Sequence, residues 1–198
     1  MWSYEEMPRI DPCIIVHEIP TYPHANPVRQ QLRLVHPRKA TTIKGKVEKL
    51  LKVGFIYLIP LIDWVSNIVL MIKKQGMIHI CIDYHDLNCV CPEDNYPTPS
   101  IDKIIDECAG SELFSFMDSF SGYNQINIAS KDQEKMDFIY PWGTFTYKKL
   151  PFGLENAGAT FHRAMSYAFH DIQNIVQPYL DDLPTHSRKH HDQLDHFR

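Results

Sequence analysis

"QPYLDDLP" (residues 177–184) places two aspartates, Asp181 and Asp182, directly after an apolar run, with a proline three residues to either side of Asp181. Adjacent acids are common in exposed turns, where they are solvated and bind nothing. The alternative is one half of a metal site. Another acid, Asp118, ends the apolar segment "LFSFM", 63 residues earlier (181 − 118). If both segments are strands of one sheet, the three carboxylates lie at one edge, and such hard oxygen ligands suit Mg²⁺.

The apolar pattern around these acids predicts alternating helices and strands. The predicted segments are a helix at 41–53, a hairpin at 66–84 with the basic turn "KKQG", a helix at 101–110 capped by Ser100, a strand–turn–strand at 113–128, a helix at 158–172, a strand at 174–180 and a helix at 188–198. Residues 1–40 contain six prolines and predict an extended lead-in. This order of elements indicates an α+β domain.

Charge is unevenly distributed along the chain, whose net charge is −4. Residues 1–74 have a net charge of +5 (11 Lys+Arg − 6 Asp+Glu), and residues 75–198 have −9 (9 − 18). A basic front and an acidic rear suit a protein that binds a polyanion with one part and metal with the other, although chance clustering on solvated faces is the simpler explanation. The five cysteines lack Cys-x-x-Cys spacing, which favours free thiols, and Asp63 interrupts the apolar stretch "LIPLIDWV", so no membrane span is expected.

Several stretches, taken in order, resemble the reverse transcriptase of Ty3/gypsy-type LTR retrotransposons, especially those of plants. They are "CIDYHDLN" (81–88), "CPEDNYPTPSIDKIID" (91–106), "SFMDSFSGYNQI" (115–126), "LPFGLENAGATFHRAM" (150–165) and "YLDD" (179–182). Any one of them is weak evidence, but together they form an ordered match across roughly residues 28–187. The resemblance implies a right-hand polymerase with a central antiparallel sheet packed on helices, fingers-like at 41–112 and palm-like at 113–198.

The resemblance also implies a catalytic site. Asp118 and Asp181 would bridge two Mg²⁺ ions, with Mn²⁺ as an alternative, Asp182 would be an accessory acid, and the carbonyl of Ser119 would complete one coordination shell. The reaction would be two-metal nucleotidyl transfer of a dNTP to a primer 3′ end on an RNA or DNA template.

Other matched positions would bind the nucleotide. Tyr123 would pack under the incoming sugar, Phe152 would face the ribose, and Gly153 would allow close backbone approach. Lys73 and Lys74 at the basic turn would reach the triphosphate. An ordinary core tyrosine and a solvated turn are the alternatives at 123 and 73–74, and simple helix packing is the alternative for "NAGATF" (156–161).

The chain departs from the family pattern at several positions. His79 and His85 stand where the family usually has arginines, and we expect both on the hairpin with Lys73 and Lys74. Histidine offers neither the permanent charge nor the fork of arginine to a triphosphate. Two further departures are Asp137, in place of a small apolar residue, and Glu155, in place of a lysine. Pro178 and Pro184 each remove a backbone donor beside the aspartates.

The sequence ends shortly after the aspartates, so we expect a fragment of a polyprotein. The family's primer-gripping segment, thumb, ribonuclease H and integrase would follow, and without them processive synthesis is not expected. The resemblance implies an intracellular setting, in a cytoplasmic particle or the nucleus, with no membrane partner. A catalytically inactive remnant that only binds nucleic acid or a partner is the alternative, favoured by His79, His85 and Glu155.

Overall fold

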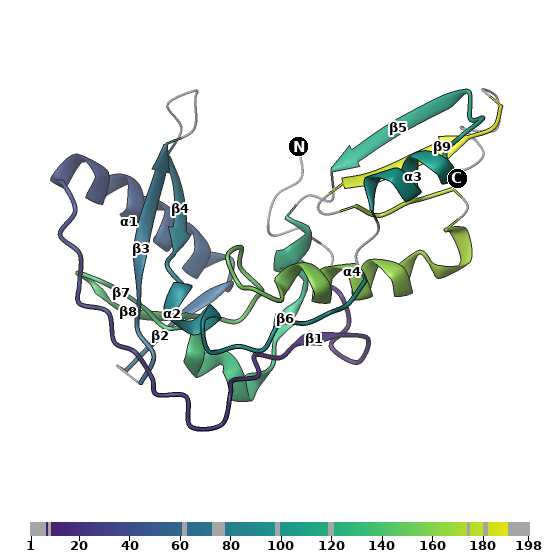
Figure 1. The fold of residues 1–198 in the computed structure, drawn as a ribbon. Coiled ribbons are helices and arrows are strands. Elements are labelled where there is room, and N and C mark those ends of the chain that lie inside the picture. The colour runs from purple at the N-terminus through teal and green to yellow at the C-terminus, as the bar shows by residue number, and fades with distance from the viewer. Residues whose placement is uncertain are drawn as a thin grey trace. The chain divides into compact units, whose positions relative to one another are not determined.

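Two stretches of chain, far apart in sequence, build each of two units in the computed structural model (Figure 1). Unit 1 comprises Met1–Glu93 and Tyr123–Ala157, and unit 2 comprises Asp94–Gly122 and Gly158–Arg198. The structure describes residues 7, 9–60, 63–72, 78–97, 100–118, 121–173, 175–179 and 182–189.

A five-stranded sheet forms the centre of unit 1, in the order β2-β8-β7-β3-β4. Its strands are β2 (Ile56–Ile59), β3 (Ser66–Ile72), β4 (Ile78–Ile82), β7 (Phe138–Tyr140) and β8 (Gly143–Tyr147). All neighbours pair antiparallel except β3 and β7, which run parallel. The antiparallel pairing of β3 with β4 confirms the predicted hairpin, whose tip at 73–77 lies outside the described residues.

Helix α1 (Pro37–Lys52) packs beside the hairpin, in contact with β4 (Figure 1). It begins four residues before the predicted start (41 − 37), because proline is well suited to a first helical turn, where no N–H is needed. The predicted apolar face is buried at Ile43 and Val47. Gly54, with φ +73°, follows the helix as a left-handed terminator.

Short elements complete unit 1. Strand β1 (Val16–His17) pairs parallel with β6 (Asn127–Ile128), α2 (His85–Asn88) follows β4, and two 3-10 helices, η1 (Gly122–Gln125) and η2 (Ser130–Met136), flank β6. The lead-in between residues 9 and 36 contains no other helix or strand.

Unit 2 pairs two strands with two helices. Its elements are α3 (Ile101–Glu107), β5 (Leu113–Asp118), α4 (Ala157–Ala168, whose first residue lies in unit 1), η3 (His170–Ile172) and β9 (Asp182–Ser187). Strands β5 and β9 form a two-stranded antiparallel sheet. Ser100 caps α3 as predicted, since its hydroxyl accepts a bond from the Lys103 N–H at 3.2 Å. The α+β class is confirmed.

The predicted strand at 174–180 was wrong. Among the described residues of this segment only isolated bridges form, Val176 to Thr185 and Tyr179 to Asp182, and the strand begins at Asp182 instead. Pro178 lies between the two bridging residues and has no N–H to continue a ladder. The predicted helix at 188–198 lies outside the described residues from 190 onward.

All five cysteines are free thiols, as predicted. No helix in the described part of the chain combines the length and the apolar character needed to cross a membrane.

Candidate active site

The two aspartate segments meet in unit 2 through the register of β5 and β9. Asp118, the last residue of β5, pairs directly with Asp182, the first residue of β9. The predicted convergence at one end of an antiparallel sheet therefore holds for the backbones of Asp118 and Asp182, although this sheet is the two-stranded one and not the five-stranded sheet of unit 1. Asp181 and Ser119 lie outside the described residues.

Backbone hydrogen bonds tie residues 177–179 to the start of β9. Tyr179 and Asp182 exchange two backbone hydrogen bonds, each 2.9 Å long, across residues 180–181. Gln177 also donates its N–H to the carbonyl of Pro184 at 2.9 Å. These bonds connect β9 to the segment before it, whereas the ladder between β5 and β9 sets Asp182 opposite Asp118.

The four basic residues expected on one hairpin are not all there. His79 lies on β4 and pairs with Met71 of β3. His85 is the first residue of α2 instead, so the prediction was wrong for this residue. Strand β4 ends at Ile82, and Tyr84 is the N-cap residue of α2. The Asp83 carboxylate accepts a bond from the His85 N–H at 3.4 Å, a local contact between the strand and the helix. Lys73 and Lys74 lie outside the described residues.

The structure brings together the two aromatic residues predicted to contact the nucleotide. The rings of Tyr123, in η1, and Phe152, in the turn before α4, have centroids 4.7 Å apart. Tyr123 is buried, whereas Phe152 is 53% exposed. Tyr123 thus supports a ring whose other side is open to solvent.

Gly153 follows in a backbone conformation that needs glycine, with φ +103°. A Cβ at this position would lie 3.7 Å from the Ile82 carbonyl oxygen, an ordinary contact. The requirement for glycine therefore comes from the backbone angle rather than from crowding within the protein.

Asn88 holds this turn in place, a role that the sequence did not suggest. Its amide Nδ2 donates to the carbonyl of Gly153 at 2.8 Å, and its Oδ1 accepts from the N–H of Glu155 at 3.1 Å. Asn88 is the last residue of "CIDYHDLN", and its place in that motif was the one signal that the sequence offered. In the structure, Tyr84 and Leu87 of the same motif are buried. One side chain thus satisfies two backbone groups of the turn that carries Phe152.

The rest of that motif anchors α2. The Asp83 carboxylate pairs with Arg33 at 2.7 Å, and Asp86 accepts from the Gln30 amide at 2.8 Å. Burial raises the pKa of the Tyr84 hydroxyl well above its usual value, and that hydroxyl donates to the Met136 carbonyl at 3.4 Å. Asn88 is therefore presented from a helix that is fixed on several sides.

Asp137, flagged as unusual from the sequence, is fully buried at the start of β7. Neither carboxylate oxygen has a hydrogen-bond partner in the described part of the chain. Thr146 is close by, but its hydroxyl donates to the Gln133 carbonyl at 2.6 Å. Burial raises the pKa of Asp137 to about 7. An unpaired buried acid of this kind destabilises the fold when it ionises.

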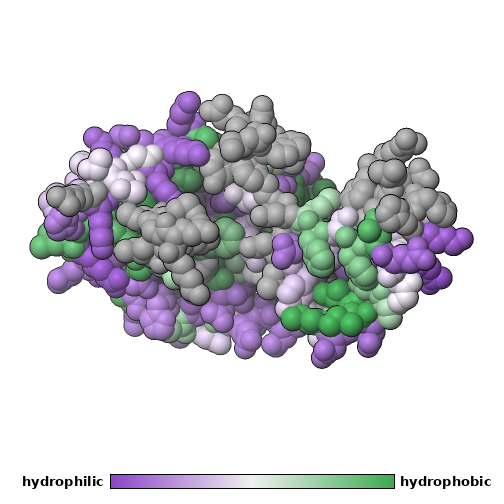
Figure 2. Space-filling model, turned by 90° about the horizontal axis from the view of Figure 1, so that it is seen from above, coloured by the Kyte–Doolittle hydropathy of each residue, from purple (hydrophilic) through white to green (hydrophobic). Residues whose placement is uncertain are grey.

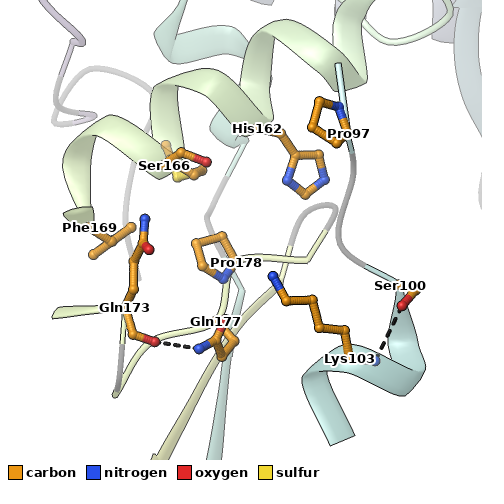
Figure 3. A pocket seen from close by; sticks show the side chains of 10 residues that line it. Pro97, Ser100, Lys103, His162, Ser166, Phe169, Gln173, Gln177 and Pro178 are labelled. Atoms are coloured by element: carbon orange, nitrogen blue, oxygen red, sulfur yellow. Dashed lines mark hydrogen bonds between the residues drawn. The ribbon is translucent and has the colours of Figure 1, made fainter. Parts of the chain in front are cut away.

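A pocket of about 400 Å³ opens in unit 2 beside α4 (Figure 3). His162 and Ser166 reach it from the helix, and Lys103 extends toward it from α3. The other lining residues are Pro97, Ser100, Met165, Phe169, Gln173, Gln177 and Pro178, with the Gln177 amide bonded to the Gln173 carbonyl. Burial lowers the pKa of His162, which favours its neutral form. The described residues of its lining include no acid, so they do not provide the ligands that Mg²⁺ prefers.

The side chains that the structure describes form no metal-binding cluster. No group of three or more histidines, cysteines or acids converges among those residues. The predicted ligand set extends beyond them, since it includes residues 119 and 181. What the described residues provide is the backbone register that sets two acids, Asp118 and Asp182, opposite each other, and carboxylates are the ligand type that a hard divalent cation prefers.

Comparisons with known proteins agree with these features. The sequence profile of the family "Reverse transcriptase (RNA-dependent DNA polymerase)" matches residues 72–198. An RNA-directed DNA polymerase homolog of Oenothera berteroana is 35% identical over 125 residues, which are 61% of this chain and 88% of that protein. The Pol polyprotein from transposon gypsy of Drosophila melanogaster is 32% identical over 163 residues, which cover 78% of this chain and 16% of the polyprotein.

The Tf2-3 transposon polyprotein of Schizosaccharomyces pombe is 27% identical over 163 residues, covering 82% of this chain and 12% of that protein. The chain thus spans a small part of the two polyproteins. Among solved structures, the foamy viral protease–reverse transcriptase in complex with an RNA/DNA hybrid superposes with a TM-score of 0.84 at 18% identity, over 98% of this chain and 25% of that one. The predicted fingers and palm fold is confirmed, and the chain belongs to the reverse transcriptase (RNA-dependent DNA polymerase) family.

Proposed function

We propose that this chain carries the catalytic part of an RNA-directed DNA polymerase, adding a dNTP to a primer 3′ end on an RNA or DNA template. The register of β5 and β9 supports this most strongly, because it sets Asp118 opposite Asp182. Like charges directly opposite each other weaken an antiparallel pair. A divalent cation shared by the two acids would remove that repulsion, so the arrangement suits a site that binds metal.

In this proposal Asp118 and Asp181 hold the two ions, Asp182 assists them, and the Ser119 carbonyl completes one shell. Two Mg²⁺ or Mn²⁺ ions bound there would activate the primer hydroxyl and neutralise the leaving pyrophosphate. The protein's own task is to position the reactants, since loose placement by about 1 Å costs on the order of a hundredfold in rate.

The Tyr123–Phe152 pair and the Asn88-held turn would form the sugar side of the nucleotide site. Phe152 is exposed and rests on the buried ring of Tyr123, so it offers a fixed apolar surface to a ribose. Asn88 and the positive φ of Gly153 keep that surface in one position. Lys73, Lys74, His79 and His85 are proposed as contacts to the triphosphate. The relatives' names and the foamy viral complex with an RNA/DNA hybrid support nucleic acid as the partner.

A non-catalytic remnant that only binds nucleic acid is favoured by one observation. Asp137 is buried without a partner at a position where relatives of this kind usually have a small apolar residue. A destabilising replacement of this type accumulates in chains that are not selected for activity. Activity assays therefore need to report binding and chemistry separately.

The test is addition of a single labelled nucleotide to a primer on an RNA template, with Mg²⁺ or Mn²⁺. Removing one metal-binding carboxylate forfeits several kcal/mol of transition-state stabilisation, so Asp182→Asn should lower the rate by roughly a thousandfold. Asp171→Asn is the matched control, because Asp171 is an exposed acid of unit 2 that pairs only with His170 in the described chain, at 2.8 Å. Equal rates for wild type and Asp182→Asn would refute the catalytic assignment. Hybrid binding without any nucleotide addition would identify the remnant.

A further inference from the structure

A second pocket, in unit 1, is lined by cationic side chains that the proposed polymerase site does not use. It has a volume of about 690 Å³. Its lining residues are Arg9, Ile10, Asp11, Pro12, Val53, Gly54, Asn127, Lys148 and Lys149. None of them is among the residues proposed to bind metal or dNTP. The volume is in the range of pockets that hold small organic ligands.

Lys149 is the central feature of this pocket. Only 6% of its surface is exposed, and its ammonium forms no hydrogen bond or ion pair with any residue that the structure describes. The backbone on both sides is fixed, since Lys149 bridges to Asn127 and Leu150 donates to the Ile126 carbonyl at 3.0 Å. Burial, and then the positive charge of Arg9, lower the pKa of Lys149. Its ammonium is not one of the fully enclosed polar atoms that lack a partner, so most of the side chain is buried while the charge reaches the pocket or solvent. Burial of most of the side chain weakens the hydration of that charge, which no described carboxylate offsets.

The other charged groups of the pocket reinforce the positive potential. Arg9 and Lys148 are exposed at its rim, and the Lys148 ammonium lies 4.8 Å from the centre of the Tyr57 ring. Asp11 is the one acid among the described lining residues, and its carboxylate accepts a hydrogen bond from the Cys13 N–H at 2.8 Å. The described lining thus contains three cationic residues and one acid.

We propose that this pocket binds a phosphate group, with Lys149 as its buried contact and Arg9 and Lys148 as contacts at the rim. A phosphate supplies a counter-charge that no described residue gives to Lys149, together with several acceptor oxygens, while arginine forks and lysine ammonium groups are the usual donors to it. A hydrophobic side chain would fill the position of Lys149 at lower cost if its role were only structural. The phosphate could belong to a free nucleotide or to a nucleic-acid backbone, and the experiment below separates these sources.

This site is independent of polymerisation. It contains no proposed metal ligand, so binding should persist in EDTA, where a metal-dependent triphosphate site does not contribute. Failure of nucleotide addition therefore leaves this proposal intact, and failure of phosphate binding leaves the polymerase proposal intact.

The experiment is calorimetric titration of the full chain in EDTA at constant ionic strength, balanced with chloride. Inorganic phosphate, dAMP and a single-stranded RNA are the three probes. Loss of a charged hydrogen-bond donor costs roughly one to two powers of ten in affinity, so Lys149→Met should weaken binding at least about tenfold. Lys46→Met is the matched control, because Lys46 is an exposed lysine of α1 in the same unit.

Thermal unfolding gives a second readout. Without ligand, Lys149→Met should melt at or above the wild-type temperature, since a weakly hydrated charge that no described carboxylate offsets has been removed. Phosphate should raise the melting temperature of wild type and of Lys46→Met, but not of Lys149→Met. If Lys149→Met does not fold, Arg9→Gln, at an exposed position, should weaken binding about threefold or more. Equal affinities of the wild type and the folded variants, or no binding of any probe to wild type, would overturn the proposal. Tighter binding of dAMP than of RNA would identify a free nucleotide, and the reverse a nucleic-acid backbone.

Discussion

Unit 1 buries two acids and a lysine, whereas no acid, lysine or arginine is buried among the unit 2 side chains that the structure describes. The buried acids and lysine of the described chain, Asp132, Asp137 and Lys149, all lie in unit 1. In unit 2 the buried polar side chains are hydroxyls and imidazoles, and Phe116 on β5 is 76% exposed. Figure 2 shows hydrophobic residues at the surface on the right of the view, where Figure 1 draws α3 and β5.

This difference predicts which substitutions and conditions change the stability of each unit. In unit 1 the balance between buried charges and their partners controls stability, so pH and single polar substitutions should have large effects. In unit 2 a two-stranded sheet buries less apolar surface, and such small sheets are marginal alone. Substitutions on the open face of β5 should therefore cost little.

The largest effect is expected from Asp137. Its folded pKa, about 7, is above the ordinary value of 3.8, so the folded state keeps a proton that the unfolded chain loses as pH rises. The free energy of unfolding should therefore fall between about pH 4 and pH 7, by on the order of 4 kcal/mol from this group, and then level off. Asp137→Ala should remove this pH dependence and stabilise the protein at pH 8, as measured by urea unfolding across the pH range.

Asp132 is the matched control, because it is equally buried but paired. It accepts from the Ile19 N–H at 3.0 Å and from the Lys135 ammonium at 2.8 Å. Asp132→Ala should lower stability at pH 8 by about 1–3 kcal/mol, since it leaves these donors unsatisfied. If both alanine variants destabilise the protein equally, the distinction between paired and unpaired buried acids is wrong.

Asn88→Ala should have the next largest effect. It removes both bonds to the turn at 151–155 and should cost about 1–3 kcal/mol. Asn88→Asp keeps the acceptor for the Glu155 N–H but loses the donor to Gly153, so its cost should be smaller. Hydrogen exchange measured by mass spectrometry should speed up at 151–155 in the alanine variant. Unchanged exchange there would show that the turn is held by other contacts.

A smaller change, on the order of 1 kcal/mol, is expected from Arg163→Lys in unit 2. Arg163 forms two bonds to the Asp94 carboxylate, each 2.6 Å long, and lies 4.7 Å from the centre of the Tyr96 ring. Lysine has a single ammonium group and cannot form the two parallel hydrogen bonds that the guanidinium makes to the carboxylate. Arg29→Lys in unit 1 is the control, because Arg29 makes a single exposed contact to Asp63 at 3.1 Å. Chemical unfolding should distinguish the two, and an equal loss in both would argue against the bidentate geometry.

The smallest effect on stability is expected from Phe116→Ser, within about 0.5 kcal/mol, because the ring is already in water. The variant should also associate less in sedimentation velocity, since it loses an exposed apolar group. Phe161→Ser, at a fully buried position of α4, should cost about 3–5 kcal/mol by comparison. A large loss of stability in Phe116→Ser would mean that this face of β5 is covered in solution.

Local chemistry explains which elements could be predicted from the sequence. Ser100 identified the start of α3, and the apolar runs around the basic turn identified the β3–β4 hairpin. The segment at 174–180 looked like a strand by composition, but Pro178 interrupts its hydrogen bonding. Composition alone does not show which backbone groups find partners.

Residues of the candidate site that lie within sequence motifs could be proposed from the sequence. Contacts between residues far apart in the sequence could not. The ordered motifs indicated Asp118 and the acids at 181–182, and the resemblance marked Asp137 as unusual. Asn88 and Gly153 are 65 residues apart, so no local pattern suggests their bond. No sequence feature singled out Lys149, because its burial depends on residues distant in sequence, 9–12 and 53–54, which line the same pocket.

The pairing of Asp118 with Asp182 also has a consequence for folding. Its partners are 64 residues apart (182 − 118), with α4 between them in sequence. Closing a loop of that length lowers the entropy of the chain before the strands gain any stabilising contact. Pairings between distant segments therefore form late in folding. During synthesis, we expect β5 to remain without its β9 partner until β9 has emerged from the ribosome. Asp118 and Asp182 would then be paired late in the folding of this part of the chain, and the proposed metal site could not form before that pairing.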